Sequence, residues 1–393
     1  MTTLNSVPSG LLSTVDATGT LNIQTNSVNA LAIDTNQNAT MNYVSAQNTF
    51  GFKNRIINGA MVISQRGTSF TPALYDYTLD RYQTQVTQSS KFTIAQSTTA
   101  PAGFGFSMLA TSSSAYSITS TDCFAEKQYI EGFNFYDCAW GTASAKTVTL
   151  SFWVQSSLTG TFGGALQNAA GNRSYPYSYT ISSANTWTQV SVTIPGDTTG
   201  TWVGATNGVG CVVIFSLGMG STLSNTAGSW AAGDYRSVTG ATSVVGTNGA
   251  TFYITGVQLE KGSIATPFDY RDYGRELALC QRYCWVTSRL IVSVIALGQC
   301  YSTNGASYLL NNPVPMRTAP SVSFNNQAYF NMSNSVNSGV GHSTSISLGT
   351  ANENTVRVDA TCSLSNLTAG SVSQLFNADG SANNGIITIS AEL

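Results

Sequence analysis

The strongest constraint on the fold is an alternation of apolar and polar residues that recurs along the chain. In the segment VTLSFWV, Val148, Leu150, Phe152 and Val154 fall on one face of a strand. Runs rich in Gly, Asn and Pro separate this segment from its neighbours and predict turns. Many short strands at such spacing are typical of a β-sandwich or barrel. Further strands are predicted over 190–194, 212–217 and 251–259.

Charge is sparse, and this favours the same fold class. Asp, Glu, Lys and Arg make up 9 % of the 393 residues, against about 25 % in typical soluble domains. Long surface helices depend on Glu, Lys and Arg, so the composition disfavours them. A disordered chain is disfavoured too, because 42 % of residues are hydrophobic and 10 % aromatic. The chain is expected to be all-β.

The length is too great for one ordinary core, and composition divides the chain into three parts. Residues 1–52 lack Lys and Arg, residues 53–272 hold the clearest strands, and residues 273–393 start with a charged stretch before strand-like composition returns. We predict a short β-strand segment, a central β-sandwich, and a junction helix followed by a smaller C-terminal β domain.

The first part contains a weak ten-residue repeat, LNIQTNSVNA followed by LAIDTNQNAT. Leu21 matches Leu31 and Ile23 matches Ile33, so each copy puts two apolar residues on one strand face before a polar turn. A pair of short strands cannot bury such a face alone. Identical chains are the obvious neighbours, so the repeat predicts an oligomer.

The junction helix is predicted over 273–284. Tyr273, Leu277, Cys280 and Cys284 would form one apolar stripe on it. Cys280 and Cys284 could place two thiols on one face, as zinc sites do, but the apolar stripe favours burial. All seven Cys are scattered and no secretory signal precedes them, so reduced thiols are expected. No metal or cofactor is predicted.

Several function classes receive little support. The net charge of −2 and the absence of a Lys/Arg cluster argue against nucleic-acid binding. The most apolar run, 290–297, is far shorter than the roughly 20 residues of a membrane-spanning helix. Without a secretory signal, the chain is expected to be made in a cytoplasm and to stay soluble.

Catalytic residues are also scarce. The densest carboxylate cluster, Asp269, Asp272 and Glu276, is interleaved with Arg271 and Arg275, which favours ion pairing at a domain junction over acid–base chemistry.

A Ser-His-Asp or Cys-His arrangement would have to use His342, the one histidine of the chain. It lies in a Gly/Ser-rich segment, so an exposed loop position is expected. The chain is predicted not to be an enzyme.

Aromatic residues near turns are the best candidates for ligand contact. Sugar rings have apolar C–H faces that stack on Trp and Tyr, although both residues are also routine in sandwich cores. Three Trp lie near Gly-rich turns, and NRSYPYSY carries three alternate Tyr with an Arg nearby. The candidate glycan-binding residues are Trp140, Arg173, Tyr175, Tyr177, Tyr179, Trp202 and Trp230.

Four blocks carry a family likeness: NRIINGAMVISQRGTSF with YTLDRY, AWGTASAKTVTLSFWVQSSLTGTF, SYTISSANTWTQVSVTIPGDTTGTW, and ATFYITGVQLEKGSIATPFDYRDYGRELALCQRY. Their order resembles a domain of many tailed-phage tail-fibre proteins, over residues 53–283. The resemblance implies a jelly roll similar to carbohydrate-binding modules, a homotrimeric fibre, and attachment to host cells. It also implies that an N-terminal segment docks onto the virion. It supplies no catalytic motif.

The expected protein is therefore a structural fibre component of a phage virion that binds a host surface glycan. Residues 1–52 would dock onto tail or neck proteins and pair with sister chains, using Leu21, Ile23, Leu31 and Ile33. A head or collar fibre, or a capsid decoration protein, is the first alternative. A polysaccharide depolymerase is the second. No nucleic-acid partner and no membrane insertion are expected.

Overall fold

The computed structural model divides the chain into two compact units, Met1–Lys53 and Asn54–Leu393. The residues that it describes are 6–7, 10–11, 21–25, 28–33, 39–40, 52–287, 293–334, 336, 341–363, 365, 367–377 and 385–393.

The N-terminal unit contains short strands, as the repeat predicts. Strands β3 (Leu21–Thr25) and β4 (Val28–Ile33) pair antiparallel, with Leu21 opposite Ile33 and Ile23 opposite Leu31. Virion docking and oligomerisation through these residues stay predictions. The remaining strands of this unit are β1 (Ser6–Val7), β2 (Gly10–Leu11) and β5 (Ala39–Thr40).

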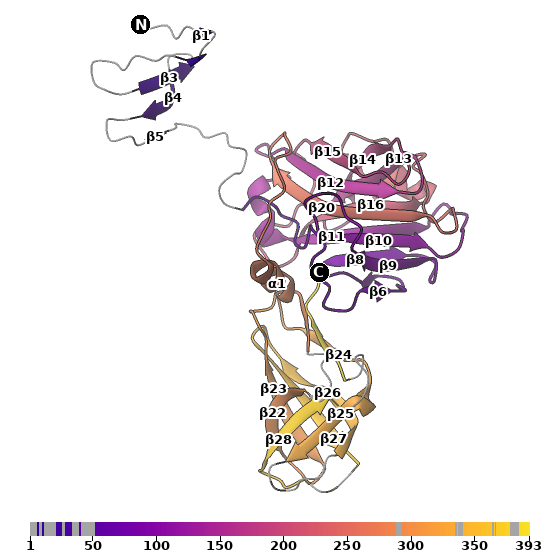
Figure 1. The fold of residues 1–393 in the computed structure, drawn as a ribbon, viewed down its shortest axis with the longest axis vertical. Helices are drawn as coiled ribbons and strands as arrows, with labels where there is room; N and C mark the ends of the chain where they lie inside the picture. The colour runs from indigo at the N-terminus through magenta and orange to yellow at the C-terminus, as the bar shows by residue number, and fades with distance from the viewer. Residues whose placement is uncertain are drawn as a thin grey trace. The chain divides into compact units, whose positions relative to one another are not determined.

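The second unit begins with the predicted jelly-roll β-sandwich, made of two antiparallel sheets (Figure 1). The six-stranded sheet has the order β15 (Thr188–Ile194), β12 (Val148–Ser156), β20 (Thr251–Lys261), β10 (Ser107–Ser112), β9 (Phe92–Ser97), β6 (Ser69–Phe70). The seven-stranded sheet has the order β18 (Ala231–Ala232), β14 (Arg173–Ile181), β13 (Gly160–Gln167), β16 (Val209–Met219), β11 (Cys123–Glu131), β8 (Tyr82–Val86), β7 (Asp76–Tyr77). Short elements in the connections are η1 (Gly132–Asn134), η2 (Tyr136–Cys138), η3 (Ser221–Leu223), β17 (Ser224–Asn225) and β19 (Ser237–Val238).

The alternation in the sequence explains how the sandwich packs. The predicted face of β12 is buried, and the ring of Phe152 packs edge-on against Tyr179 at 5.1 Å and Phe215 at 5.2 Å, between ring centroids. Tyr179 and Phe215 come from the opposite sheet, so these contacts join the two layers. Burying a side chain of this size contributes roughly 1.5–3 kcal/mol to folding.

Helix α1 (Tyr273–Gln281) follows the sandwich. Among the described residues it is the only α-helix. Asp272 caps its N-terminus by accepting a hydrogen bond from the main-chain N–H of Arg275, at 2.9 Å. The prediction extended the helix to Cys284, and this was wrong. Cys284 pairs with Ser390 in a sheet instead, and Tyr273 is 64 % exposed rather than part of a buried stripe.

The C-terminal part is β-structured, as predicted, and has a hydrophobic core of its own. Its barrel is closed by β22 (Val294–Cys300), β23 (Gly305–Asn311), β27 (Thr355–Cys362), β26 (Gly341–Ala351), β25 (Phe330–Asn334) and β28 (Val372–Asn377). A separate three-stranded sheet contains β21 (Cys284–Val286), β29 (Ile387–Ser390) and β24 (Ser321–Phe324), and η4 spans Gln327–Tyr329. The boundary proposed at residue 272 stays a prediction. No helix in the described part of the chain has the length and apolar character to cross a membrane.

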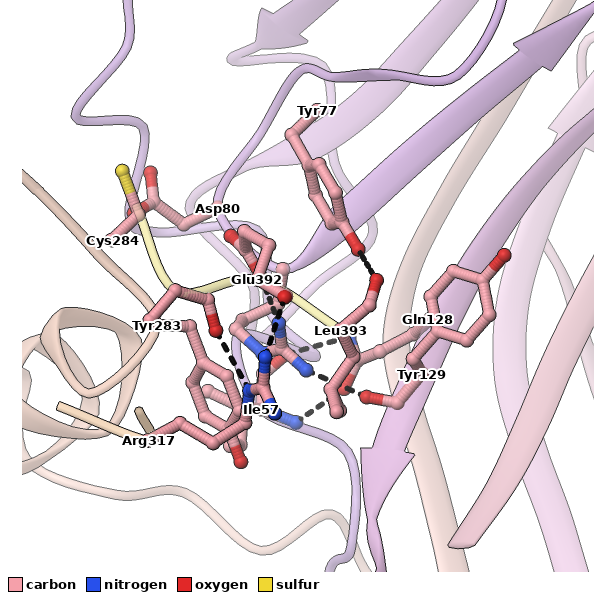
Figure 2. A network of polar contacts seen from close by, with 12 residues as sticks. Ile57, Tyr77, Asp80, Gln128, Tyr129, Tyr283, Cys284, Arg317, Glu392 and Leu393 are labelled. Carbon is pink, nitrogen blue, oxygen red and sulfur yellow. Dashed lines mark hydrogen bonds and ion pairs between the residues drawn. The ribbon is translucent and has the colours of Figure 1, made fainter. Parts of the chain in front are cut away.

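The last residues of the chain return to the sandwich and form what we call the C-terminal clamp, comprising Arg66, Tyr77, Arg81, Arg317 and residues 391–393. Figure 2 shows Tyr77, Arg317, Glu392 and Leu393 of this clamp. The carboxylate of Glu392 forms ion pairs with Arg66, at 3.0 Å, and with Arg81. The hydroxyl of Tyr77 donates to the main-chain oxygen of Leu393 at 2.6 Å. Arg81 is 1 % exposed, so its charge depends on this partner.

Further contacts hold the same segment from the barrel side. Arg317 donates to the main-chain oxygens of Ala391, at 2.8 Å, and Glu392, at 2.9 Å. The guanidinium of Arg81 also lies over the ring of Tyr283, 3.5 Å from its centroid. The clamp thus ties the chain's last residues to both the sandwich and the start of the C-terminal part.

Candidate functional site

Three of the predicted aromatic residues meet at one end of the sandwich. Ring centroids of Trp140 and Trp202 are 4.7 Å apart, those of Trp140 and Trp230 5.0 Å, and those of Trp202 and Trp230 5.5 Å. All three pairs are edge-on, the geometry that aromatic quadrupoles favour. Because each Trp comes from a different connection between strands, the cluster joins three loops.

Arg173 and Tyr175 on β14 border this cluster. The ring of Tyr175 lies 5.3 Å from that of Trp230, and the guanidinium of Arg173 lies 5.9 Å from the same ring. Arg173 makes a bidentate ion pair with Asp197, at 2.8 and 2.7 Å. Burial alone would raise the pKa of Asp197, but hydrogen bonds from Arg173 and Trp202 outweigh it and hold that pKa below its ordinary value.

The polar edges of the three Trp are occupied by protein acceptors. The indole N–H of Trp140 donates to the carbonyl of Lys146 at 2.7 Å, and that of Trp230 to the carbonyl of Pro195 at 2.8 Å. The indole of Trp202 donates to Asp197 at 3.1 Å. Trp140 is buried, whereas Trp202 and Trp230 are half-buried and present part of their rings at the surface. The cluster is thus first of all a brace for the loops.

The three alternate Tyr residues of β14 were predicted as candidates for glycan binding, but they lie in the core. Tyr175, Tyr177 and Tyr179 are 5 %, 1 % and 7 % exposed, and they point into the sandwich core. The hydroxyl of Tyr177 donates to the carbonyl of Ile214 at 2.8 Å, and burial raises its pKa well above the ordinary value. Alternation put the three rings on one face of the strand, but that face is the inner one, so they do not reach a ligand at the surface.

A cavity of about 200 Å³ lies elsewhere in the sandwich, and sequence reasoning missed it. Three aromatic rings line it: Phe104, Phe268 and Tyr270, with centroids 4.9–5.5 Å apart. Tyr270 is 60 % exposed and its hydroxyl donates to the carbonyl of Gly103 at 3.0 Å. We call this site the aromatic cavity.

A glycine in β20 makes room for one wall of the aromatic cavity. Gly256 has a φ of +62°, at a point where the register between β12 and β20 shifts. A Cβ there would come within 2.7 Å of the ring of Phe104. The bulge therefore allows the Phe104 ring to lie against the strand.

Charged groups line the opposite side of the aromatic cavity. Arg271 pairs with Glu276 at 3.2 Å and with Asp269 at 3.7 Å, which confirms the predicted ion pairing at the junction. Arg271 also donates to the carbonyl oxygens of Asn54 and Ile56. Oδ2 of Asp269 faces Arg271, whereas Oδ1 accepts none of the hydrogen bonds found among the described residues. The cavity thus combines ring faces with one open carboxylate oxygen.

Phe104 lies in the run AGFGF, and an aromatic residue between glycines in a loop was the signal that could have pointed to the aromatic cavity. Its partners Phe268 and Tyr270 come from a distant loop, and no pattern in the sequence joins the two.

Of the residues considered for catalysis and metal binding, His342 lies in a different kind of element from the one predicted. His342 is exposed, as predicted, but it lies on strand β26 and not in a loop. None of the seven Cys takes part in a disulfide, and all seven are buried, including Cys280 and Cys284. Among the residues that the structure describes, no group of three His, Cys, Asp or Glu could hold a metal ion.

Neither a protein-family model nor a curated protein sequence matches the chain. Among solved structures, similarity extends to the enzymatically active domain of tailspike protein 4 from bacteriophage CBA120, with 14 % identity and a TM-score of 0.31 over 53 % of this chain and 21 % of that one. A sugar binding protein of Bacteroides thetaiotaomicron gives 14 % identity and a TM-score of 0.32, over 53 % of this chain and all of that one.

A family 11 carbohydrate-binding module from Clostridium thermocellum gives 10 % identity and a TM-score of 0.26, over 51 % of this chain and 98 % of that one. The TM-scores and identities are low throughout, so these likenesses do not bear on what this chain binds.

Proposed function

We propose that this chain is a non-enzymatic fibre protein of a tailed-phage virion that attaches the particle to a host surface glycan. The observation that carries the glycan-binding part is the aromatic cavity. A sugar ring can place its C–H face on Tyr270 and Phe104 while one of its hydroxyl groups donates to Oδ1 of Asp269. The volume of about 200 Å³ is below the roughly 300–1,000 Å³ of drug-sized pockets, so a single sugar ring is the expected occupant.

The fibre part of the proposal is supported by the order of the sequence blocks, the sparse charge and the paired strands of residues 21–33. In a homotrimer, three weak sites would act together, and avidity would exceed the affinity of each site without further contacts. A head or collar fibre, or a capsid decoration protein, would use the same features. Cryo-EM of the virus that encodes the chain separates these locations.

Tyr270→Ala is expected to weaken glycan binding at least tenfold, because it removes the most exposed ring of the aromatic cavity. A glycan array probed with the full-length protein identifies the ligand, and titration calorimetry then compares the variants. Tyr273→Ala is the matched control, since Tyr273 is equally exposed but does not line the cavity. Equal binding by Tyr270→Ala and wild type, or no binding to any neutral glycan, would contradict the proposed site.

Trimer formation through the N-terminal strands has its own test. Mass photometry of the full-length protein is expected to give three times the 41.4 kDa chain mass. The double variant Ile23→Asp/Leu31→Asp is expected to shift the protein to monomers, because it puts charge into a face that sister chains would bury. Asn22→Asp, at a polar position of the same strand, serves as the control. A monomeric wild-type protein would rule out the trimer.

The depolymerase alternative predicts that reducing sugar is released from host polysaccharide. No observation on the described residues favours this alternative. The two carboxylates that line the aromatic cavity, Asp269 and Glu276, already pair with Arg271.

A further inference from the structure

Lys127 is an unusual cation on the outer face of the seven-stranded sheet. It lies at the middle of β11 and is only 5 % exposed. Its ammonium takes part in none of the ion pairs or hydrogen bonds found among the described residues. Buried charges are normally paired, because removing an ion from water is costly. The nitrogen itself is not among the fully buried atoms without a partner, so the ammonium reaches the surface at the end of a largely buried side chain, where it is open to a ligand.

The pKa of Lys127 is lowered to about 8, mainly by burial and also by the charge of Arg236, against opposing contributions from Cys123 and Asp234. At pH 7 the ammonium is still mostly protonated. The neighbouring charge of Arg236 is already balanced, because Arg236 makes a bidentate ion pair with Asp234 at 2.8 and 2.7 Å. Of the two positive charges on this surface, the one without an ion-pair partner is therefore that of Lys127.

The polar side chains around Lys127 have hydrogen-bond donors available for a ligand. Gln83 lies opposite Lys127 in the sheet register, and its side-chain oxygen accepts from the hydroxyl of Tyr129 at 3.2 Å, which leaves its amide N–H groups available. The hydroxyl of Tyr75 accepts from Gln85 at 3.3 Å, which leaves its own proton available. With the Lys127 ammonium, this makes three donors on one surface. A ligand that satisfies them must bring acceptors and a negative charge.

Two aromatic rings flank the same surface. The ring of Tyr75 is 50 % exposed, and the Lys127 nitrogen lies 5.8 Å from its centroid. Tyr129, two residues along β11, is half-buried on the same face. Aromatic ring faces beside a cation suit a ligand that is part apolar and part anionic. A small inorganic anion would contact the cation but not the ring faces.

We propose that the surface formed by Lys127, Gln83, Tyr75 and Tyr129 binds the carboxylate of an acidic sugar residue. The carboxylate takes the Lys127 ammonium and the Gln83 amide, and the sugar ring lies against Tyr75. This surface shares no residue with the aromatic cavity, so it is a second site with a different ligand chemistry.

Titration calorimetry with the full-length protein tests the site. The probes are trigalacturonic acid, its methyl ester, 3′-sialyllactose and inorganic phosphate. At least one acidic saccharide is expected to bind, and for trigalacturonic acid the methyl ester is expected to bind at least tenfold more weakly. Lys127→Met is expected to reduce acid binding at least tenfold, and Tyr75→Ala by a smaller factor. Lys146→Met, at an exposed lysine, is the control for loss of charge alone.

Three outcomes would overturn the proposal: neither acidic saccharide binds, Lys127→Met binds as wild type does, or inorganic phosphate binds as tightly as the saccharide. Thermal melting of Lys127→Met guards against a folding defect, and an unchanged or higher melting temperature is expected because burial disfavours the charged form of Lys127. Tyr270→Ala keeps acid binding if the two sites are separate, so failure here and failure of the aromatic cavity are distinguishable.

Discussion

Glu392→Gln is expected to lower the free energy of unfolding by about 3–5 kcal/mol, the range measured when one partner of a buried ion pair is removed. The carboxylate of Glu392 is the counter-ion of both Arg66 and Arg81, and Arg81 is almost fully buried. Glutamine keeps the shape of the side chain but turns an N–H toward guanidinium groups that are themselves donors. The buried Arg81 would then lack its negative partner, and Arg66 would keep only the nearby charge of Asp80.

Denaturant unfolding at pH 7 measures this effect through the shift of the transition midpoint. Glu353→Gln makes the same chemical change at an exposed position of the barrel and is expected to alter stability by less than about 0.5 kcal/mol. If both variants unfold at the same denaturant concentration as wild type, the C-terminal clamp contributes no net stability.

Glu126→Gln is expected to stabilise the protein at alkaline pH by up to about 5 kcal/mol. Glu126 is fully buried on the inner face of β11, where Oε1 accepts from the Thr84 hydroxyl at 2.7 Å and Oε2 has no hydrogen-bond partner. Burial raises its pKa to about 8 from an ordinary value of 4.5. The folded protein therefore holds a proton that the unfolded chain releases at lower pH.

The sign of the pH dependence follows. Between pH 4.5 and about pH 8 the folded state binds more protons at Glu126 than the unfolded state, so stability falls as pH rises through this window and levels off above it. Glutamine cannot ionise and lacks this contribution. Unfolding curves of wild type and Glu126→Gln at pH 5, 7 and 9 are expected to diverge with increasing pH. A constant difference across the three pH values would show that Glu126 does not titrate in the window.

Local sequence pattern was a good guide to the strands of the sandwich. The alternation over 251–259 identified β20, which spans Thr251–Lys261, and the other predicted strands of the block were located as closely. Alternation fails at the next step, because it shows which residues share a face and not which face is buried. Tyr177 and Tyr179 therefore seemed as available for a ligand as for the core.

Features that depend on distant partners could not be predicted. Cys284 continues the helical pattern of 273–281, but pairing with Ser390 makes it a strand residue. The aromatic cavity joins Tyr270 to Gly103, residues separated by 167 positions. The unpaired state of Lys127 is likewise a property of its surroundings in three dimensions, because the sequence KQY around it is unremarkable in charge.

The C-terminal clamp also constrains the order of events on the ribosome. Arg81 lies in the turn just before β8 of the sandwich, but its counter-ion Glu392 is added 311 residues later. During synthesis the strands of the sandwich can pair before residue 392 is made, so the nascent sandwich holds the Arg81 guanidinium without this counter-ion. Chains truncated before residue 392 would keep Arg81 in that state, and we expect them to be more open to proteolysis. The contacts of the C-terminal clamp are thus a late step in folding, which follows the pairing of the sandwich strands.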